Sequence, residues 1–205
     1  MASWSTSRWG RVPLSGDAPY VDNSASTARA FRHEKRLRPR AHRNMLIQVE
    51  RVVIVGRGGA GKSTAALRLS ELTGLPVIEL DKRFWRPDLT PTPRDEWIQM
   101  QRELIASPQW IMDGDFGPHD VLAVRLARAD AVLILDFSFV RCAWRAARRS
   151  RERADFWRWL LMWRLRSRPA LFKTVAGHAL GADVRVLRNP AQLRRYLATI
   201  DEQMT

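Results

Sequence analysis

Cysteine is nearly absent from this sequence, and long apolar runs are missing altogether. The single cysteine, Cys142, excludes an internal disulfide and is typical of a protein kept in a reducing cytoplasm. The chain contains no signal-peptide core and no apolar stretch of about 18 residues, so we expect a soluble protein without a transmembrane segment. The longest aromatic stretch, residues 156–163, is too short to cross a bilayer.

Acidic residues are scarce relative to basic ones. The chain has 21 Asp and Glu against 35 Lys and Arg, which gives a formal charge of +14. Such a charge suits nucleic acid, an anionic lipid surface or a polyanionic small molecule as a partner. The arginines gather at residues 29–43 and again at 141–168. A general preference for arginine over lysine is an alternative explanation for part of both clusters.

The first 44 residues lack helical and strand periodicity and are rich in Ser, Ala, Arg and Pro. We therefore expect a disordered basic tail at 1–44 and one folded domain at 45–205. Met45 opens the recognisable domain and is a candidate for the native start, the alternative being a genuine basic tail. With 205 residues and 45% hydrophobic content, the chain can bury one substantial core.

Strand patterns alternate with helical patterns from Leu46 onward. This alternation predicts an α/β fold, a parallel sheet with helices on both faces. Gly74 and Pro76 mark the end of the first helix. The expected strands are 48–55, 77–80, 110–112, 131–135 and 184–187, and the expected helices are 63–73, 93–105, 140–153 and 191–200.

A glycine-rich segment directly follows the first apolar strand and matches the Walker A pattern G-x-x-x-x-G-K-[ST]. Backbone N–H groups in such a loop surround a phosphate, and the following helix directs its positive end at the anion. Lys62 is expected to reach the β- and γ-phosphates and Ser63 to ligate Mg²⁺, which predicts ATP and Mg²⁺ as cofactors. The predicted nucleotide-binding residues are Gly56, Arg57, Gly58, Gly59, Ala60, Gly61, Lys62, Ser63 and Thr64.

Three expected strands end in aspartate: Asp81, Asp113 and Asp136. In an open parallel sheet, ligands lie beyond the carboxyl ends of the strands, so these side chains are candidates to face the phosphate loop. One carboxylate beside Ser63 is enough for Mg²⁺, which takes hard oxygen ligands and keeps several waters. Each aspartate alone is equally explained as a turn or helix-capping residue.

Segments 80–87, 110–116 and 125–130 resemble the adenylate kinase-related proteins called topology modulation proteins. The shared pieces are Leu-Asp-x-x-x-Trp-x-Pro and Trp-Ile-x-Asp-Gly, in that order, and the resemblance spans about residues 51–200. It implies a P-loop nucleotide-kinase fold with a five-stranded parallel sheet in the order 2-3-1-4-5.

The same resemblance implies roles for individual residues. Asp113 would hold Mg²⁺ directly or through water, and Asp81 would orient or deprotonate the phosphoryl acceptor. Arg125 is similar to the arginine that family members offer to a substrate phosphate. Arg145 and Arg149, nine and thirteen positions after Asp136, match the arginines that contact the nucleotide in adenylate kinases. Each arginine is otherwise explained as part of a solvated helix face.

The chain departs from the family pattern in several places. Asp115 stands where the family usually has Asn, Phe116 where it has Tyr, and Leu89 where a second Trp is common. The arginine-rich lid region near 149–168 is shorter than in relatives, which predicts slow turnover or a binding-only protein as alternatives to full activity. The aromatic stretch 156–163 is expected to be a helix packed under the lid, and an amphipathic membrane-surface helix is the minor alternative.

The sequence thus favours a cytoplasmic ATP-dependent kinase acting on a small molecule, with a nucleotide as the preferred acceptor. The second hypothesis is a nucleic-acid-binding regulator that uses the nucleotide as a switch, although no helix-turn-helix or zinc signature is visible. The third is a kinase for a non-nucleotide acceptor such as a sugar acid, because Asp81 suits that chemistry equally well. Preference for ATP over GTP follows from the resemblance alone.

Overall fold

The computed structural model describes residues 49–88, 90–116, 120–149 and 154–204 of the chain. The expectations for a disordered tail at 1–44, for a start at Met45 and for Leu89 fall on residues outside this description. The elements run in the order β1 (Arg51–Gly56), α2 (Lys62–Thr73), β2 (Val77–Glu79), α3 (Asp81–Phe84), α4 (Arg94–Ala106), β3 (Trp110–Asp113), α5 (Leu122–Leu126), β4 (Ala131–Leu135), α6 (Phe139–Arg149), α7 (Ala154–Met162), α8 (Ser167–His178), β5 (Asp183–Leu187) and α9 (Pro190–Met204).

The five strands form one parallel sheet in the order β2-β3-β1-β4-β5, so the predicted fold and strand order are confirmed. The first strand lies at the centre, between β3 and β4. Ile54 pairs with Asp113, and Gly56 pairs with Leu135, which aligns the carboxyl ends of the three central strands at one edge. The segments that follow these strands therefore meet at that edge.

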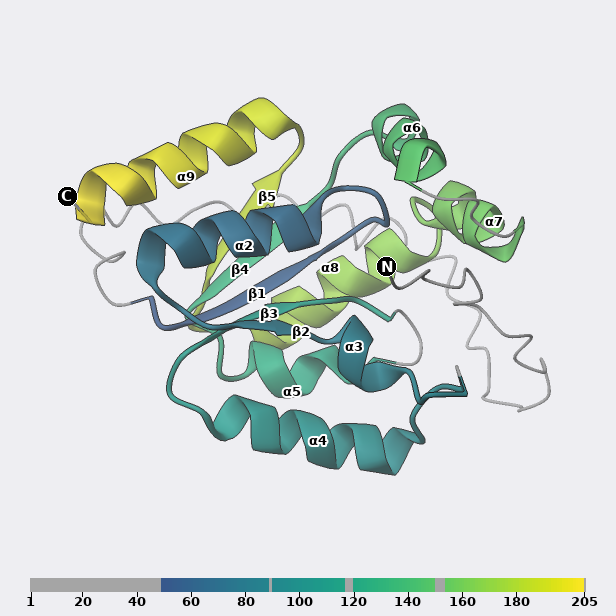
Figure 1. Ribbon diagram of the computed structural model, residues 1–205, viewed down its shortest axis with the longest axis horizontal. Helices are drawn as coiled ribbons and strands as arrows, with labels where there is room; N and C mark the ends of the chain where they lie inside the picture. The colour runs from purple at the N-terminus through teal and green to yellow at the C-terminus, as the bar shows by residue number, and fades with distance from the viewer. Residues whose placement is uncertain (1–48, 89, 117–119, 150–153, 205) are drawn as a thin grey trace, which may run out of the picture.

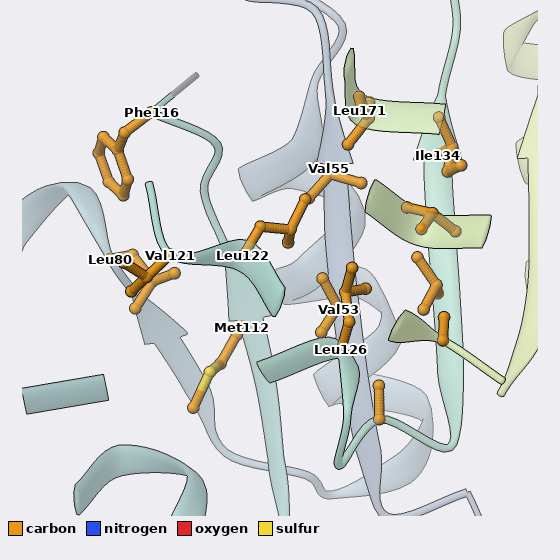
Figure 2. Close-up of a cluster of buried hydrophobic side chains, with 14 of the residues drawn as sticks. Val53, Val55, Leu80, Met112, Phe116, Val121, Leu122, Leu126, Ile134 and Leu171 are labelled. Atoms are coloured by element: carbon orange, nitrogen blue, oxygen red, sulfur yellow. The ribbon is translucent and has the colours of Figure 1, made fainter. Parts of the chain in front are cut away.

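Helices cover both faces of the sheet, with α2 and α9 on one side and α4, α5 and α8 on the other (Figure 1). Alternate residues of β1 supply the two cores. Val53 and Val55 pack with residues of α5 and α8, and Figure 2 shows Leu122, Leu126 and Leu171 around them. The second core lies on the opposite face of β1. It joins Val52 and Ile54 of β1 to buried residues of α2 (Ala66 and Leu69) and of α9 (Ile200).

Most predicted elements are present with shifted ends, but the helices α3, α5 and α8 were not predicted. In α8 the buried residues Leu171, Phe172 and Val175 give only a weak helical pattern in the sequence. Pro169 lies in the first turn of α8, where a proline is easily interpreted as a break between elements. Proline is tolerated there because the first N–H groups of a helix have no intrahelical partner. The arginine-rich helix α6 is described over Phe139–Arg149, and its predicted continuation to Arg153 falls on residues outside the description.

Candidate nucleotide-binding site

The loop between β1 and α2 has the backbone conformation that phosphate binding requires. Gly59 and Gly61 have φ angles of 75° and 92°, a left-handed region that residues with a Cβ rarely adopt. The ammonium of Lys62 folds back over the loop and donates a hydrogen bond to the Gly56 carbonyl at 3.1 Å. The lysine is thus held across the concave side of the loop, where the pattern predicts the phosphates to bind.

The N-terminus of α2 has no side chain capping its N–H groups and no acidic residue in its first turn. Its first N–H groups therefore keep their capacity for an external acceptor, and the helix dipole favours an anion there. Ser63 and Thr64, the next two residues of the predicted site, are exposed in this first turn. Loop and helix together have the features expected of the predicted phosphate site.

Asp113 lies at the end of β3, beside this predicted site. Burial raises the pKa of its carboxyl group, while the charge of Lys62 and a hydrogen bond with the Ser63 side chain act in the opposite direction. The Oδ1 atom is buried and has no hydrogen-bond partner among the described residues. A buried carboxylate oxygen without a donor, next to a serine hydroxyl, fits the hard-oxygen donor set that Mg²⁺ prefers.

Two more carboxylates lie near Asp113. Asp81 starts α3 directly after β2, and the charges of Asp81 and Glu79 both raise the pKa of Asp113. Glu79 is paired with Lys82 at 2.6 Å, whereas Asp81 is exposed. The structure therefore brings Lys62, Ser63, Asp81 and Asp113 to one edge of the sheet, although their individual roles remain predictions.

Arg145 of α6 reaches the phosphate loop. A Cβ atom placed on Gly61 would lie 3.2 Å from one of its Nη atoms, so the guanidinium lies directly against the loop. Arg149 is the last residue of α6, and its side chain lies outside the described part of the structure. Of the expected pair, Arg145 lies at the loop, and the place of the Arg149 side chain stays a prediction.

The aromatic helix α7 lies beside α6, beyond the carboxyl ends of the central strands (Figure 1), and its side chains reach the phosphate loop. A Cβ atom on Gly58 would come within 2.8 Å of the Trp159 ring and 3.0 Å of the Phe156 ring. Sequence reasoning explained Gly58 only by loop conformation and missed this contact. The aromatic residues themselves were the signal, since α7 needs a surface on which to bury them.

Arg125, expected from the resemblance to contact a substrate phosphate, is engaged by groups within the protein. Its side chain is fully buried and forms a bidentate pair with Asp120, with both N–O distances at 2.7 Å. It also donates to Gln101 at 3.1 Å and to the Gly114 carbonyl at 2.7 Å. These contacts fix the backbone after β3, so a role for Arg125 at a substrate phosphate, which stays a prediction, requires the guanidinium to leave them.

Arg57, inside the loop, is buried as well, with 3% of its surface exposed. Its guanidinium carbon lies 4.8 Å from the centre of the Trp163 ring and 5.9 Å from that of Phe139. The Walker A pattern leaves this position open, so the sequence held no signal for its environment.

A separate cleft lies at the amino-terminal edge of the sheet, between α2 and α9, and is lined by Arg51, Asp130 and Tyr196 among others. Burial raises the pKa of Tyr196 to about 12, so its hydroxyl stays protonated.

In the described part of the chain, no group of three or more His, Cys, Asp or Glu side chains is arranged to hold a metal ion. None of the described helices combines the length and apolar character that a bilayer crossing needs.

Comparisons with known proteins agree with this architecture. No family model and no curated protein matches the chain. Shikimate kinase from Acinetobacter baumannii in complex with shikimate is 19% identical, and the match covers 77% of this chain and 93% of that one with a TM-score of 0.53. A deoxyadenosine kinase from M. mycoides is 13% identical over 75% of this chain and 99% of that one, with a TM-score of 0.45.

A gluconokinase from Sinorhizobium meliloti 1021 is 17% identical over 76% of this chain and 95% of that one, with a TM-score of 0.44. Of the three matches, the one to shikimate kinase has a TM-score above 0.5, and it bears on the fold. Together with the strand order and the phosphate loop, it defines the architecture as that of the P-loop kinases. At 19% identity the likeness extends to the fold and not to the substrate.

Proposed function

We propose that this protein is an ATP-dependent phosphotransferase that acts on a small molecule. The observation that carries the proposal is the grouping of Lys62, Ser63 and Asp113 at the carboxyl edge of the sheet, with the unpartnered Oδ1 atom of Asp113 beside the serine. Phosphoryl transfer depends mainly on positioning and charge neutralisation, and these residue types supply both. The proposed location is the cytoplasm, where ATP is made.

The proposed roles follow from the position of each residue. The loop N–H groups and Lys62 would bind the β- and γ-phosphates, and Ser63 and Asp113 would hold Mg²⁺. When bound, Mg²⁺ neutralises charge on the phosphates and orients them for in-line attack. Arg145 would contact the phosphates from α6, and Asp81 would orient the acceptor hydroxyl or accept its proton.

The acceptor is a nucleotide in the adenylate kinase-like version of this proposal, in keeping with the resemblance to topology modulation proteins. One observation favours the second version, in which the acceptor is a hydroxylated molecule such as a sugar acid. In the first version, the Arg125 guanidinium binds the phosphate of the acceptor. In the structure, this guanidinium is already paired with Asp120 and donates a hydrogen bond to Gln101. The second version needs no rearrangement of that buried group.

The test is ADP release from Mg·ATP against nucleoside monophosphates, nucleosides and sugar acids. The proposal expects one acceptor to stimulate ADP release in the wild-type protein and expects the stimulation to disappear in Lys62→Ala. Stimulation by a non-phosphorylated acceptor would select the second version. Flat basal hydrolysis across the panel, with tight ATP binding, would instead favour a nucleotide-dependent regulatory role.

A further inference from the structure

Arg57 is a buried cation without a carboxylate of its own. Among the residues that the structure describes, no Asp or Glu forms an ion pair with it, and its buried Nε has no hydrogen-bond partner. The contacts that favour its charge are cation–π contacts with the ring faces of Trp163 and Phe139. A cation–π contact is worth far less than the hydration that a buried guanidinium loses.

The charges around Arg57 make its position still less favourable. Asp136 attracts it, but that carboxylate already accepts two hydrogen bonds from Arg168, at 3.0 and 2.9 Å. Arg164 and Arg168 repel it, and burial is the largest factor that lowers the pKa of its guanidinium. Lys62 and Arg145 add further positive charge at the same loop. Around Arg57 itself, two arginines, Arg164 and Arg168, therefore stand against one carboxylate, Asp136.

A buried cation without a paired carboxylate among the described residues, next to a predicted phosphate site, has a simple complement, a polyanion. A triphosphate on the loop would place several negative charges near Arg57 in a site where burial weakens dielectric screening. The cation that is unfavourable in the free protein would then be favourable in the complex. A neutral side chain of similar length would fill the space beside Trp163 without this dependence on a ligand.

We propose that Arg57 is a positioning residue for the polyphosphate chain, a buried charge that is compensated when the phosphate loop is occupied. It acts through its field and through its packing on Trp163, which ties the loop to the segment that follows α7. The inference rests on the proposed binding of ATP at this loop. It adds a determinant of polyphosphate affinity that the Walker A pattern does not contain.

The test is a calorimetric titration of Mg·ATP into wild type, Arg57→Met, Arg57→Lys and Lys62→Ala, with melting temperatures measured without nucleotide. Arg57→Met keeps the length of the side chain and removes its charge. We expect it to melt no lower than wild type in the absence of nucleotide and to bind Mg·ATP about tenfold more weakly. Arg57→Lys should retain most of the affinity, because it keeps the charge.

Affinity equal to wild type in Arg57→Met would overturn the inference. A second result would also overturn it: a much lower melting temperature without nucleotide in Arg57→Met and also in the polar variant Arg57→Gln. Destabilisation by both substitutions would mean that Arg57 has a purely structural role. Wild type and Lys62→Ala separate this failure from that of the proposed function. If wild type binds Mg·ATP and Lys62→Ala does not, the nucleotide site stands whatever Arg57 does; if wild type does not bind, the proposed function fails first.

Discussion

Buried charge is handled in opposite ways at two places in this molecule. Behind the end of β3, the Asp120 carboxylate and the Arg125 guanidinium are 2% and 0% exposed and are bound to each other, to Gln101 and to the Gly114 carbonyl. At the phosphate loop, Arg57 and Asp113 are also buried, but among the described residues neither forms an ion pair. The Nε atom of Arg125, like that of Arg57, has no hydrogen-bond partner in the described part of the chain, so the difference lies in the counter-charge. The first region is complete in the sense that its charges are paired, and the second is incomplete because its charges are not.

The difference separates a structural role from a functional one. Removing one partner of a buried ion pair strongly lowers the stability of the protein, because the other charge is then buried without compensation. An unpaired buried charge lowers stability unless a ligand supplies the missing partner, and proteins tolerate such groups mainly at sites of function. On this reasoning the carboxyl edge between β1 and β3 is the site that ATP and Mg²⁺ would complete.

Breaking the complete region should have the largest effect on stability. Asp120→Asn leaves the Arg125 guanidinium buried without its counter-charge, so the free energy of unfolding should fall by about 3–5 kcal/mol. Urea denaturation followed by tryptophan fluorescence measures this change. A loss under about 1 kcal/mol would mean that the cluster is not the structural unit described above.

The same pair should control stability in acid. Burial by itself would raise the pKa of Asp120, but Arg125 and the surrounding hydrogen bonds hold that pKa below its usual range. A carboxyl group with a lowered folded-state pKa contributes stability above its ordinary pKa of about 4, and the contribution is lost as pH falls through the folded-state value. Denaturation midpoints from pH 6 downward should therefore drop more steeply for wild type than for Asp120→Asn.

A partly exposed pair provides an intermediate case. Arg51 and Asp130, at the amino-terminal edge of the sheet, are 28% and 26% exposed and lie 2.8 Å apart. Asp130→Asn should lower the free energy of unfolding by about 1 kcal/mol, because water takes over part of the lost interaction. A loss as large as that in Asp120→Asn would show that exposure does not govern the strength of these pairs.

The smallest effect on stability is expected at the incomplete region. Because burial raises the pKa of Asp113, its charged form is unfavourable in the free protein, and Asp113→Asn mimics the neutral form. The free energy of unfolding should stay within about 0.5 kcal/mol of wild type or rise, while Mg²⁺-dependent ADP release falls by roughly 100-fold. Strong destabilisation with intact ADP release would reverse the two roles.

The sequence was informative where a local pattern has one physical meaning. The apolar strands, the helix end at Gly74 and the loop at Gly56 to Ser63 each depend on neighbouring residues, so one chain was enough to locate them. The strand order came from the family resemblance and was confirmed by the pairing of β1 with β3 and β4. The strand-end rule made Asp81, Asp113 and Asp136 candidates, and the resemblance singled out Asp113 for Mg²⁺, a role that stays a prediction.

The contacts that were missed join segments far apart in the chain. Nothing in the sequence around Arg125 indicates that Gln101, from α4, and Asp120 enclose its guanidinium, and the substrate role given by the resemblance stays a prediction. The packing of Trp159 on Gly58, and of Trp163 on Arg57, likewise depends on how α7 and its following turn fold over the loop. Such environments are set by tertiary packing, which neither composition nor periodicity records.

The most direct test of the nucleotide site is the melting temperature of wild type and Lys62→Ala with and without Mg·ATP. If ATP completes the carboxyl edge, saturating Mg·ATP should stabilise the wild-type protein by about 2.7 kcal/mol at a hundredfold excess over Kd, seen as a rise in melting temperature. Lys62→Ala should show little or no rise. An unchanged wild-type melting temperature, or an equal rise in the two proteins, would contradict the assignment of this loop as the nucleotide site.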